Sequence, residues 1–327
     1  MRAAVCRTNG PPEVVAVEDW PVAAVGAGEA RVRVVAAAVN FPDVLLVAGQ
    51  YQIEAPLPFV VGSELAGVVE EVAGGVDHVR PGDHVTGTSL VGAFAEEVVM
   101  PAATLSPIPA GLSDVDAVAA GVAHRTAIHV LRSGARLAAS DELVVLGAGG
   151  GVGLATVQLG AALGATVTAV ASSEEKLHAA RANGAQRTVR SGGDLRAALR
   201  GALPDGADVV VDPVGGELAE PALRSLRYGG RFVSVGYASG EIPRIPLNVV
   251  LLKGIEVRGF EFLGFATHEP DALVRNEAEL RDLLTSGRVR PHIGATFALD
   301  EVAAALRFVA DGRAVGKVVI DVAGGSD

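Results

Sequence analysis

The chain has little of what a disulfide-bonded, zinc-clustered or nucleic-acid-binding protein needs. Cys6 is the single cysteine in 327 residues, so no disulfide can form within the chain and no cysteine cluster can hold zinc. Positive charge is scarce, because 27 Lys and Arg residues face 38 Asp and Glu residues and leave a net charge of -11. Such a balance argues against general affinity for nucleic acid or anionic lipid. The first residues also lack the long apolar segment of a secretion signal, and we expect a cytoplasmic protein.

One stretch of the chain carries no charged residue at all. It runs from Leu143 to Ser173 and by length alone would span a bilayer. It also contains seven glycines, several of them clustered after a short apolar run. That pattern favours strands and a helix buried in a parallel sheet, and we predict no membrane partner.

The hydrophobic pattern changes along the chain and indicates about two domains. Residues up to about 110 read as short β-branched segments separated by Pro, Gly and Asp, which is typical of a small barrel. Beyond Ser113, apolar strands alternate with helices, as in a doubly wound parallel sheet. The predicted strands include Glu29–Ala38, Val60–Val72, Leu143–Leu146, Thr166–Ala171, Val209–Val211, Arg231–Val235 and Lys317–Val322, and the predicted helices include Val152–Leu163, Glu174–Asn183, Asp271–Ser286 and Asp300–Asp311.

The strongest chemical signal is a glycine-rich turn between a strand and a helix. It reads Leu143-Val-Val-Leu-Gly-Ala-Gly-Gly-Gly-Val-Gly153. Residues without side chains let the backbone approach a pyrophosphate, while amides at the helix N-terminus donate to it. Ala148 stands at the first position of the Gly-x-Gly-x-x-Gly fingerprint, followed by Gly150 and Gly153. The strand before the turn and the helix after it favour dinucleotide binding over a purely structural turn.

The end of the next strand bears on which dinucleotide binds. NAD sites usually carry an acidic residue there, whereas this chain has Ser172 and Ser173, with Lys176 within reach of a 2′-phosphate. Glu174 and Glu175 follow, and acids are favourable in the first turn of a helix capped by Ser172 or Ser173. We predict NADPH as the cofactor, with NADH as the alternative.

Ordered landmarks along nearly the whole chain resemble the zinc-independent quinone oxidoreductases of the medium-chain dehydrogenase/reductase superfamily. The landmarks include Asn40-Phe-Pro-Asp43, Gly49-Gln-Tyr51, Gly62-Ser-Glu64-Leu-Ala-Gly67, Thr126-Ala-Ile-His129, Asp212-Pro-Val-Gly-Gly216 and Gly312-Arg-Ala-Val-Gly-Lys-Val-Val319. The resemblance implies an α/β fold in which a GroES-like β-barrel domain, 1–120 and 262–327, encloses a Rossmann domain, 121–261. It also implies a homodimer, and the apolar segment Gly254–Phe262 could extend the sheet across a two-fold axis.

The same resemblance implies which residues form the site. Zinc-dependent relatives place a Cys where this chain has Asn40 and a His where it has Ser63, so we expect no bound metal. His124 and His129 are expected to pack on a helix rather than bind metal. The substrate cleft is expected to be bordered by Asn40, Asp43 and Tyr51, and the cofactor by Thr126, Ala148, Gly150, Gly151, Val152, Ser172, Ser173, Lys176, Arg190, Gly236, Tyr237 and Arg313.

Several of these residues have a second, purely structural interpretation. Asn40 suits a turn before Pro42, Asp43 suits a helix cap, and Tyr51 suits loop packing. Leu45 replaces an aromatic residue that is common in the family, which favours a more aliphatic cleft, and Arg190 stands about where many relatives have Tyr.

The function implied is hydride transfer from NADPH to a quinone or an α,β-unsaturated carbonyl compound. Asn40 and Tyr51 are the candidate donors to the developing oxyanion. An enoyl-thioester reductase is the alternative enzyme. A noncatalytic NADPH-binding protein of the crystallin or sensor type is the alternative of another class.

Overall fold

The computed structural model describes residues 1–324 and divides into two compact units. The first, here called the β unit, comprises Met1–Val122 and Pro291–Asp327, and the second, the α/β unit, comprises Ala123–Arg290. The helix α2, Asp114–His129, runs from one unit into the other and has non-helical dihedral angles at Gly121. The domain boundary at residue 262 stays a prediction; the compact α/β unit continues to Arg290.

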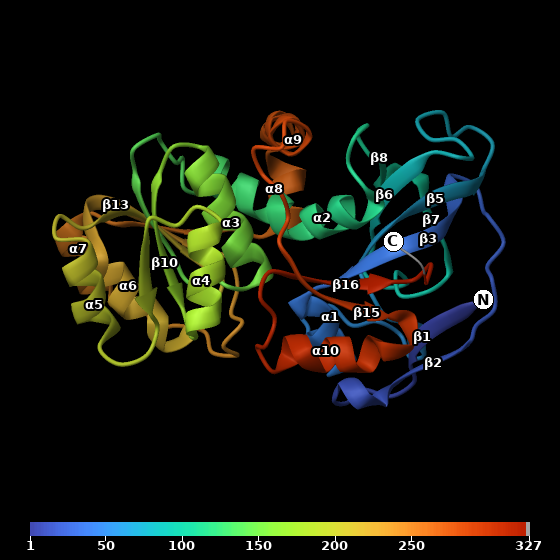
Figure 1. Ribbon diagram of the computed structural model, residues 1–327, viewed down its shortest axis with the longest axis horizontal. Helices are drawn as coiled ribbons and strands as arrows, with labels where there is room; N and C mark the ends of the chain where they lie inside the picture. The colour runs from blue at the N-terminus through green and yellow to red at the C-terminus, as the bar shows by residue number, and fades with distance from the viewer. Residues whose placement is uncertain (325–327) are drawn as a thin grey trace. The chain divides into compact units, whose positions relative to one another are not determined.

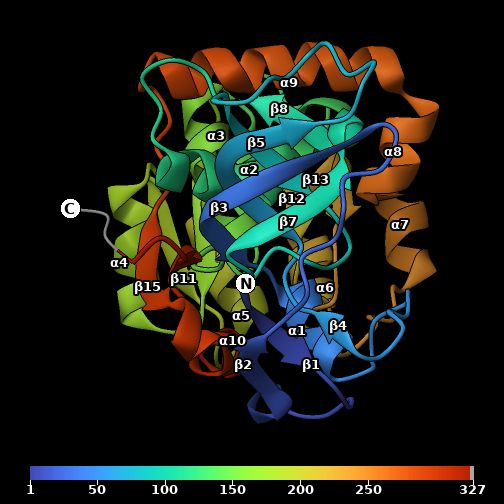
Figure 2. The same ribbon diagram turned by 90° about the vertical axis from the view of Figure 1, so that its right-hand side faces the viewer.

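The β unit consists of two sheets and a few short helices. One sheet has the order β2-β1-β4, and the other has the order β15-β16-β3-β5-β6-β8 with β7 also paired to β3. Figure 2 shows the long β3 between β5 and β7. The elements are β1 Arg2–Cys6, β2 Val15–Asp19, β3 Glu29–Val39, α1 Phe41–Val47, β4 Phe59–Val60, β5 Glu64–Val72, β6 His84–Thr88, β7 Glu97–Pro101, β8 Leu105–Pro107, β15 Ile293–Ala298, α10 Val302–Ala310 and β16 Lys317–Asp321, with single turns of 3-10 helix at Pro12–Val14, Ala102–Thr104 and Leu299–Glu301.

The α/β unit contains a parallel sheet of six strands in the order β11-β10-β9-β12-β13-β14. The chain moves outward from β9 in one direction and then crosses back to β12, which is the topology of a doubly wound sheet. The elements are a π-helical turn Val130–Gly134, β9 Glu142–Val145, α3 Gly151–Ala162, β10 Thr166–Ala171, α4 Glu174–Ala182, β11 Arg187–Arg190, α5 Leu195–Ala202, β12 Ala207–Asp212, a 3-10 turn Gly216–Leu218, α6 Ala219–Ser225, β13 Leu226–Ser234, α7 Leu247–Lys253, β14 Glu256–Gly259, α8 Phe262–His268 and α9 Pro270–Thr285.

Apolar residues on both faces of this sheet explain the charge-free stretch of the sequence. On one face Val144, Val170 and Val210 belong to a core that includes Leu199 of α5 and Leu223 of α6. On the other face α3 lies so close that a Cβ at Gly160 would be 2.6 Å from Leu143 Cδ2. Figure 1 shows α3 and α4 together on one side of β10 and α5 and α6 together on the other. Leu143 to Ser173 therefore forms β9, α3 and β10, as predicted.

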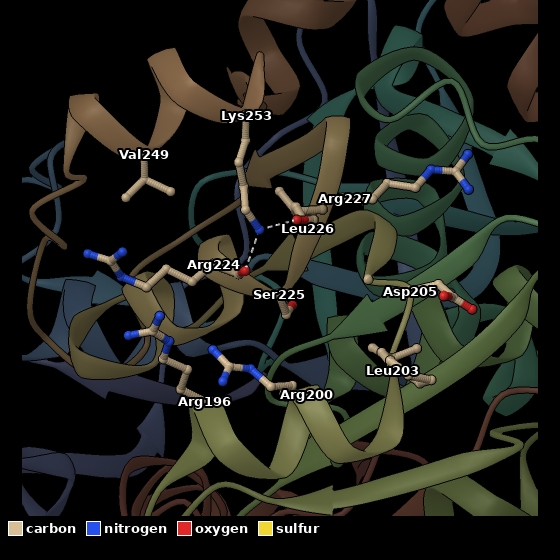
Figure 3. Close-up of a pocket in the computed structure, with 12 residues that line it drawn as sticks. Arg196, Arg200, Leu203, Asp205, Arg224, Ser225, Leu226, Arg227, Val249 and Lys253 are labelled. Atoms are coloured by element: carbon tan, nitrogen blue, oxygen red, sulfur yellow. Dashed lines mark hydrogen bonds between the residues drawn. The ribbon is translucent and has the colours of Figure 1, made fainter.

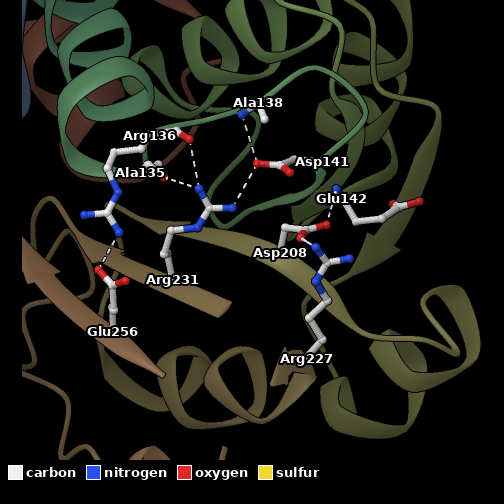
Figure 4. A network of polar contacts seen from close by, with 9 residues as sticks. All are labelled: Ala135, Arg136, Ala138, Asp141, Glu142, Asp208, Arg227, Arg231 and Glu256. Carbon is white, nitrogen blue, oxygen red and sulfur yellow. Dashed lines mark hydrogen bonds and ion pairs between the residues drawn. The ribbon is translucent and has the colours of Figure 1, made fainter. Parts of the chain in front are cut away.

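Ion pairs and hydrogen bonds fasten the amino ends of the strands in this unit (Figure 4). The guanidinium of Arg231, which lies opposite Val209 of β12, donates to the carbonyl oxygens of Ala135 and Arg136 and to the Asp141 carboxylate at 2.7, 2.9 and 2.9 Å. The Asp208 carboxylate accepts from the Glu142 amide at 2.9 Å and pairs with Arg227. The glycine turn lies at the opposite end of the sheet, where it follows the carboxyl end of β9.

Two predicted strands are shorter than the sequence indicated. Val60–Val72 is broken between β4 and β5, where Gly62 has a φ of 96° and packs against the Phe94 ring. The segment Gly254–Phe262 forms a strand only over Glu256–Gly259, and α8 begins at Phe262. Among the described residues, no helix has the length and apolar character needed to cross a bilayer.

Candidate functional site

The glycine turn after β9 is shaped by backbone approaches that exclude side chains. Gly147 has a φ of 59°, in the left-handed region that favours glycine. A Cβ at Gly153 would lie 2.0 Å from the Gly147 carbonyl oxygen, so the first turn of α3 packs directly on the glycine turn. Ala148 is fully buried, and its amide donates to the Val170 carbonyl at 3.0 Å. The Ala148 amide therefore holds the turn against β10, and the contact of Ala148 with the cofactor stays a prediction.

The N-terminus of α3 is open to an anion. Gly150 is the N-cap residue, in an extended conformation, and no side chain caps the helix. The amides of Gly151 and Val152 lie in the first helical turn, where no helical acceptor exists for them. Uncapped amides and the positive end of the helix dipole fit a pyrophosphate group.

The second part of the predicted cofactor site lies where β10 and β11 end. Ala171 pairs with Arg190, which places Ser172 and Arg190 at neighbouring strand ends. The Ser173 hydroxyl accepts from the Lys176 amide at 3.3 Å and caps α4, which confirms one of the two predicted caps.

Lys176 lies across the glycine turn. A Cβ at Gly149 would be 2.5 Å from both Cβ and Cγ of Lys176, so the lysine stem occupies the space that glycine leaves. Burial lowers the pKa of the Lys176 ammonium, while neighbouring Glu175 raises it. The nearby Glu174 carboxylate would repel a phosphate group. It is bound to Arg181 at 2.7 Å, and this contact lowers the pKa of Glu174. The residues after β10 thus place a lysine side chain beside the glycine turn.

A third set of residues lies at and just after the carboxyl ends of β12 and β13. Gly236 follows β13, and a Cβ at Gly215 would lie 2.9 Å from the ring of Tyr237, which is 44% exposed. Asp212, at the end of β12, is fully buried; its Oδ1 accepts from the amides of Val214 and Gly215 at 2.8 Å each. Its Oδ2 has no hydrogen-bond partner among the described residues, and burial raises the pKa of this carboxyl group.

Helix α2 supplies the predicted residue Thr126 and the two histidines. Thr126 is half-buried on the part of α2 that belongs to the α/β unit. His129 is fully buried, lies 4.8 Å from the Phe265 ring centroid, and contacts Phe260 and Phe262 as well. His124 is also buried and bonds to Gln158 at 2.8 Å. The prediction that both histidines pack within the fold is confirmed.

The β unit contains a buried polar centre built by strand register. Val318 of β16 pairs with Val39 of β3, which brings Lys317 beside Asn40. Ala37 of β3 pairs with Leu65 of β5, which brings Glu64 to the same place. The Lys317 ammonium donates to Asn40 Oδ1 at 2.7 Å and to Glu64 Oε2 at 3.3 Å. The Lys317 and Glu64 side chains are only 3% and 2% exposed, so this is a buried ion pair bridged by an amide.

Asp43 and Ser63 complete the centre. The Asp43 carboxylate accepts from the Asn40 amide and from the Ser63 hydroxyl, each at 2.7 Å. Burial raises the pKa of Asp43 to about 6, against the lowering effects of these two bonds and of Lys317. Asp43 also stands in the first turn of α1 with Asn40 as N-cap, so the predicted capping role is present.

Hydrogen bonds to neighbouring residues occupy the Asn40 side chain. Its Nδ2 donates to Glu64 Oε2 at 3.0 Å and weakly to the Ala38 carbonyl at 3.4 Å, while its Oδ1 accepts from Lys317. Protein partners therefore engage both its donor and its acceptor, and Asn40 is held rigidly. Tyr51 lies half-buried in the segment after α1. Arg313 lies exposed in the β unit, with its guanidinium 4.8 Å from the Phe308 ring centroid.

The sequence prediction omitted three residues of these sites. Glu64 and Lys317 form the buried ion pair, and Asp212 has an Oδ2 without a hydrogen-bond partner among the described residues. One signal was visible for Lys317, since this lysine directly precedes the apolar run Val318–Ile320 of a predicted strand. Among residues 1–324, no group of three or more His, Cys, Asp or Glu side chains is arranged to hold a metal.

Comparisons with known proteins agree with this architecture. The family description "Alcohol dehydrogenase GroES-like domain" matches residues 26–110, and "Zinc-binding dehydrogenase" matches residues 151–277. The chain is 36% identical over 324 residues to "Quinone oxidoreductase-like protein 2" of Bos taurus, covering 98% of this chain and 92% of that protein. It is 34% identical over 315 residues to "Quinone oxidoreductase" of Pseudomonas aeruginosa, covering 95% and 96%.

Solved structures give the same result. The Escherichia coli quinone oxidoreductase, determined as a complex with NADPH, superposes with a TM-score of 0.91 and 26% identity, covering 98% of this chain and 100% of that one. Sequence similarity over almost the full length and the shared two-part architecture establish the relationship. The chain belongs to the medium-chain dehydrogenase/reductase superfamily and, within it, to the quinone oxidoreductase family.

Proposed function

We propose that this protein is an NADPH-dependent reductase that transfers hydride, without zinc, to a quinone or an α,β-unsaturated carbonyl compound. The observation that carries the proposal is the glycine turn. It combines an uncapped α3 N-terminus at Gly150 with the Lys176 stem lying across Gly149. The relative from Escherichia coli binds NADPH with the same fold, which supports the assignment.

The residues of this chain fit NADPH in two places. The amides of Gly151 and Val152 would bind the pyrophosphate, because they have no helical acceptor. Lys176, with Ser173 and Arg190 at the same strand ends, would bind the 2′-phosphate. The family resemblance also assigns Arg313 to the cofactor, and this assignment stays a prediction. The cofactor, when bound, supplies the hydride.

The nicotinamide end would be held by residues at other strand ends. Gly236 lets the chain after β13 pass close to a ring, since a Cβ there would meet only the Pro213 carbonyl, at 3.5 Å. Tyr237 and Thr126 would flank the ring and its carboxamide. These assignments carry the family pattern onto the positions that match it.

The acceptor is proposed to lie beside the polar centre of the β unit. A carbonyl that receives hydride develops negative charge on oxygen, which donors fixed in advance stabilise. Lys317 holds the Asn40 amide in one orientation, and Asp43 holds the Asn40 backbone. Because the Asn40 Nδ2 group already donates to Glu64 and Ala38, the Tyr51 hydroxyl is the donor that we propose for the developing oxyanion, and Asn40 shapes the wall beside it. Leu45, half-buried in α1, favours an aliphatic acceptor wall.

The proposal that no zinc takes part has support from charge. Asn40 and Ser63 stand at the positions of two ligands in zinc-dependent relatives. The Lys317 ammonium is already bound to Asn40 and Glu64, and its charge opposes a divalent cation at the same place.

Steady-state oxidation of NADPH and NADH with a panel of quinones, enones and enoyl thioesters tests the proposal, together with elemental analysis of the protein. We expect faster turnover with NADPH, with quinones or enones preferred, and activity that survives chelation. Preference for enoyl thioesters would favour the other reductase class. NADPH binding without turnover by any acceptor would favour a noncatalytic role. One zinc per chain with loss of activity on its removal would refute the metal-free mechanism.

A further inference from the structure

The α/β unit has a second pocket at the opposite end of its sheet from the glycine turn. It has a volume of about 300 Å³ and is lined by α5, α6, α7 and the segments that lead into β12 and β13. These segments form the amino ends of the strands, whereas the glycine turn and Ser173 follow the carboxyl ends. A strand of this length spans roughly 20 Å, so the pocket is separate from the proposed cofactor site.

The pocket is strongly cationic in a chain of net charge -11. Its lining includes one carboxylate, Asp205, and five cations, Arg196, Arg200, Arg224, Arg227 and Lys253. Figure 3 shows the head groups of Arg196, Arg200 and Arg224 on the same side of Lys253, while Arg227 turns away from them. Three arginines and a lysine from α5, α6 and α7 therefore meet in one place.

Lys253 forms the fixed part of this cluster. It is half-buried, and its ammonium donates to the carbonyl oxygens of Arg224 and Leu226 at 2.7 and 2.5 Å. An ammonium has three donors, so one remains after these two bonds. Burial lowers the pKa of Lys253, and the charges of Arg196, Arg200 and Arg224 lower it further. The cations thus repel one another, and a bound anion would relieve that repulsion.

The arginines differ in whether they have partners. Arg224 pairs with Glu220 at 2.7 Å, and Arg227 pairs with Asp208. Arg196 and Arg200, one helical turn apart on α5, make no ion pair or side-chain hydrogen bond within residues 1–324. A solvated helix face would explain these two arginines alone. It does not explain their convergence with a half-buried lysine and a third arginine from two other helices.

We propose that this pocket is a binding site for a multiply charged phosphate group, such as a small phosphorylated metabolite, held by Arg196, Arg200 and Lys253. Arginine forks bind phosphate oxygens in pairs, and the remaining Lys253 donor adds a point charge. Pocket size fits a small ligand, near the lower end of the usual range of about 300 to 1,000 Å³. This phosphate site does not depend on which acceptor the enzyme reduces or on which nicotinamide cofactor it uses.

Calorimetric titration of the full-length protein with pyrophosphate tests this site. The test variant is Arg196→Gln/Arg200→Gln, which removes two charges and leaves the Lys253 bonds to the Arg224 and Leu226 carbonyls intact. The control is Arg281→Gln, which removes one positive charge from an exposed position of α9 outside the pocket. NADPH titration and thermal melting of each variant verify that the fold and the glycine turn are unchanged.

We expect wild type and Arg281→Gln to bind pyrophosphate alike, also in the presence of saturating NADPH, and the double variant to bind at least about tenfold more weakly. Equal binding by the double variant would overturn the proposal, as would equal weakening in Arg281→Gln or the absence of binding to wild type at millimolar concentration. Pyrophosphate binding that NADPH fully displaces would place it at the glycine turn and also overturn the proposal.

Discussion

Lys317 is the residue on which the polar centre of the β unit depends. Its ammonium is the cation that faces the buried Glu64 carboxylate, at 3.3 Å. Replacing it by Met keeps most of the side-chain volume but leaves Glu64 buried without its counter-charge, a change that costs about 3 to 5 kcal/mol in comparable pairs. We expect Lys317→Met to lower the free energy of unfolding by that amount in urea denaturation.

A double variant separates the lost charge pair from lost packing. Lys317→Met/Glu64→Gln removes both charges, and we expect it to recover much of the stability that Lys317→Met loses. If the single variant is as stable as wild type, the ion pair does not stabilise the fold.

Asp43 should make the stability depend on pH. Burial raises its pKa from 3.8 to about 6, so the folded protein holds this proton more tightly than the unfolded chain does. The contribution of Asp43 to stability is therefore greatest below its unfolded pKa and is lost as pH rises through about 6. A shift of this size corresponds to about 3 kcal/mol.

Asp43→Asn should remove this dependence. It should lower the stability at every pH because it loses an acceptor for the Asn40 amide or the Ser63 hydroxyl. Between about pH 3 and pH 8, wild type should lose about 3 kcal/mol more than the variant does, measured by urea denaturation at each pH. Asp77→Asn, at an exposed position of the same unit, is the control and should follow wild type. Equal pH slopes for wild type and Asp43→Asn would contradict the assignment.

Lys176 decides the proposed preference for NADPH. Lys176→Met keeps the stem that packs on Gly149 and removes only the charge. A charge-assisted contact to phosphate is worth roughly 1.5 to 3 kcal/mol, so NADPH affinity should fall by about 10- to 150-fold, less where solvent screens the contact. NADH lacks the 2′-phosphate and should bind nearly as before in parallel titrations. A wild type that prefers NADH, or equal weakening of both cofactors, would show that the phosphate site is wrong.

At the scale of elements, the contact between α3 and the glycine turn leaves no room for a methyl group. In Gly153→Ala the new Cβ would lie 2.0 Å from the Gly147 carbonyl oxygen, so α3 must move away from the turn. We expect a loss of stability of a few kcal/mol and at least tenfold weaker NADPH binding, measured by thermal melting and titration. Gly201→Ala in α5 is the matched control, because a Cβ there meets no atom within 4 Å. It should be neutral or stabilising, by up to about 1 kcal/mol. A Gly153 variant that behaves like the control would show that the turn adapts easily.

The sequence predicted those elements whose signals are local. β10 has the predicted bounds Thr166–Ala171, and α3 and α4 begin and end within a residue of the prediction, because apolar runs, glycines and a serine cap mark their ends. The start of α8 was missed. The Glu261 carboxylate caps it by accepting from the amides of Leu263 and Gly264, and glutamate is not a usual N-cap signal.

The polar centre was only partly predictable for a different reason. Asn40 and Asp43 came from a motif, but Lys317 lies 277 residues from Asn40 and meets it only through the register of β16 on β3. Single-sequence patterns do not contain that register. The occupied amide of Asn40 likewise became visible only when Glu64 and Lys317 were placed beside it.

At the scale of the whole molecule, the acidic chain concentrates positive charge in a few places. Five cations line the pocket around Arg200, and the Lys176 stem lies across the glycine turn, although the net charge is -11. Such local fields attract phosphate groups while the overall charge keeps nucleic acid and anionic surfaces away. The anionic ligands of this protein are therefore expected to be small phosphate-bearing molecules, beside the uncharged acceptor.

The edge of the sheet in the α/β unit carries exposed apolar side chains. β14 is the edge strand of the sheet, paired to β13 on one side, and Val257 in its middle is 44% exposed. Nearby in the chain, Leu251 and Leu252 are 81% and 75% exposed, an unusual amount of apolar surface for a monomer. An exposed edge strand with apolar neighbours suits pairing with a second copy across a two-fold axis.

We predict a homodimer formed through β14, which light scattering at micromolar concentrations measures directly. Val257→Lys places a charge from each copy at the shared edge and should shift the protein toward the monomer. Val22→Lys is the control, because Val22 is a similarly exposed valine, at 40%, in the β unit, and it should leave the dimer intact. Both variants should keep the melting behaviour of a folded chain, since neither side chain is buried. A wild type that is monomeric across this range would refute the pairing, and a dimer that resists Val257→Lys but not Val22→Lys would place the interface in the β unit instead.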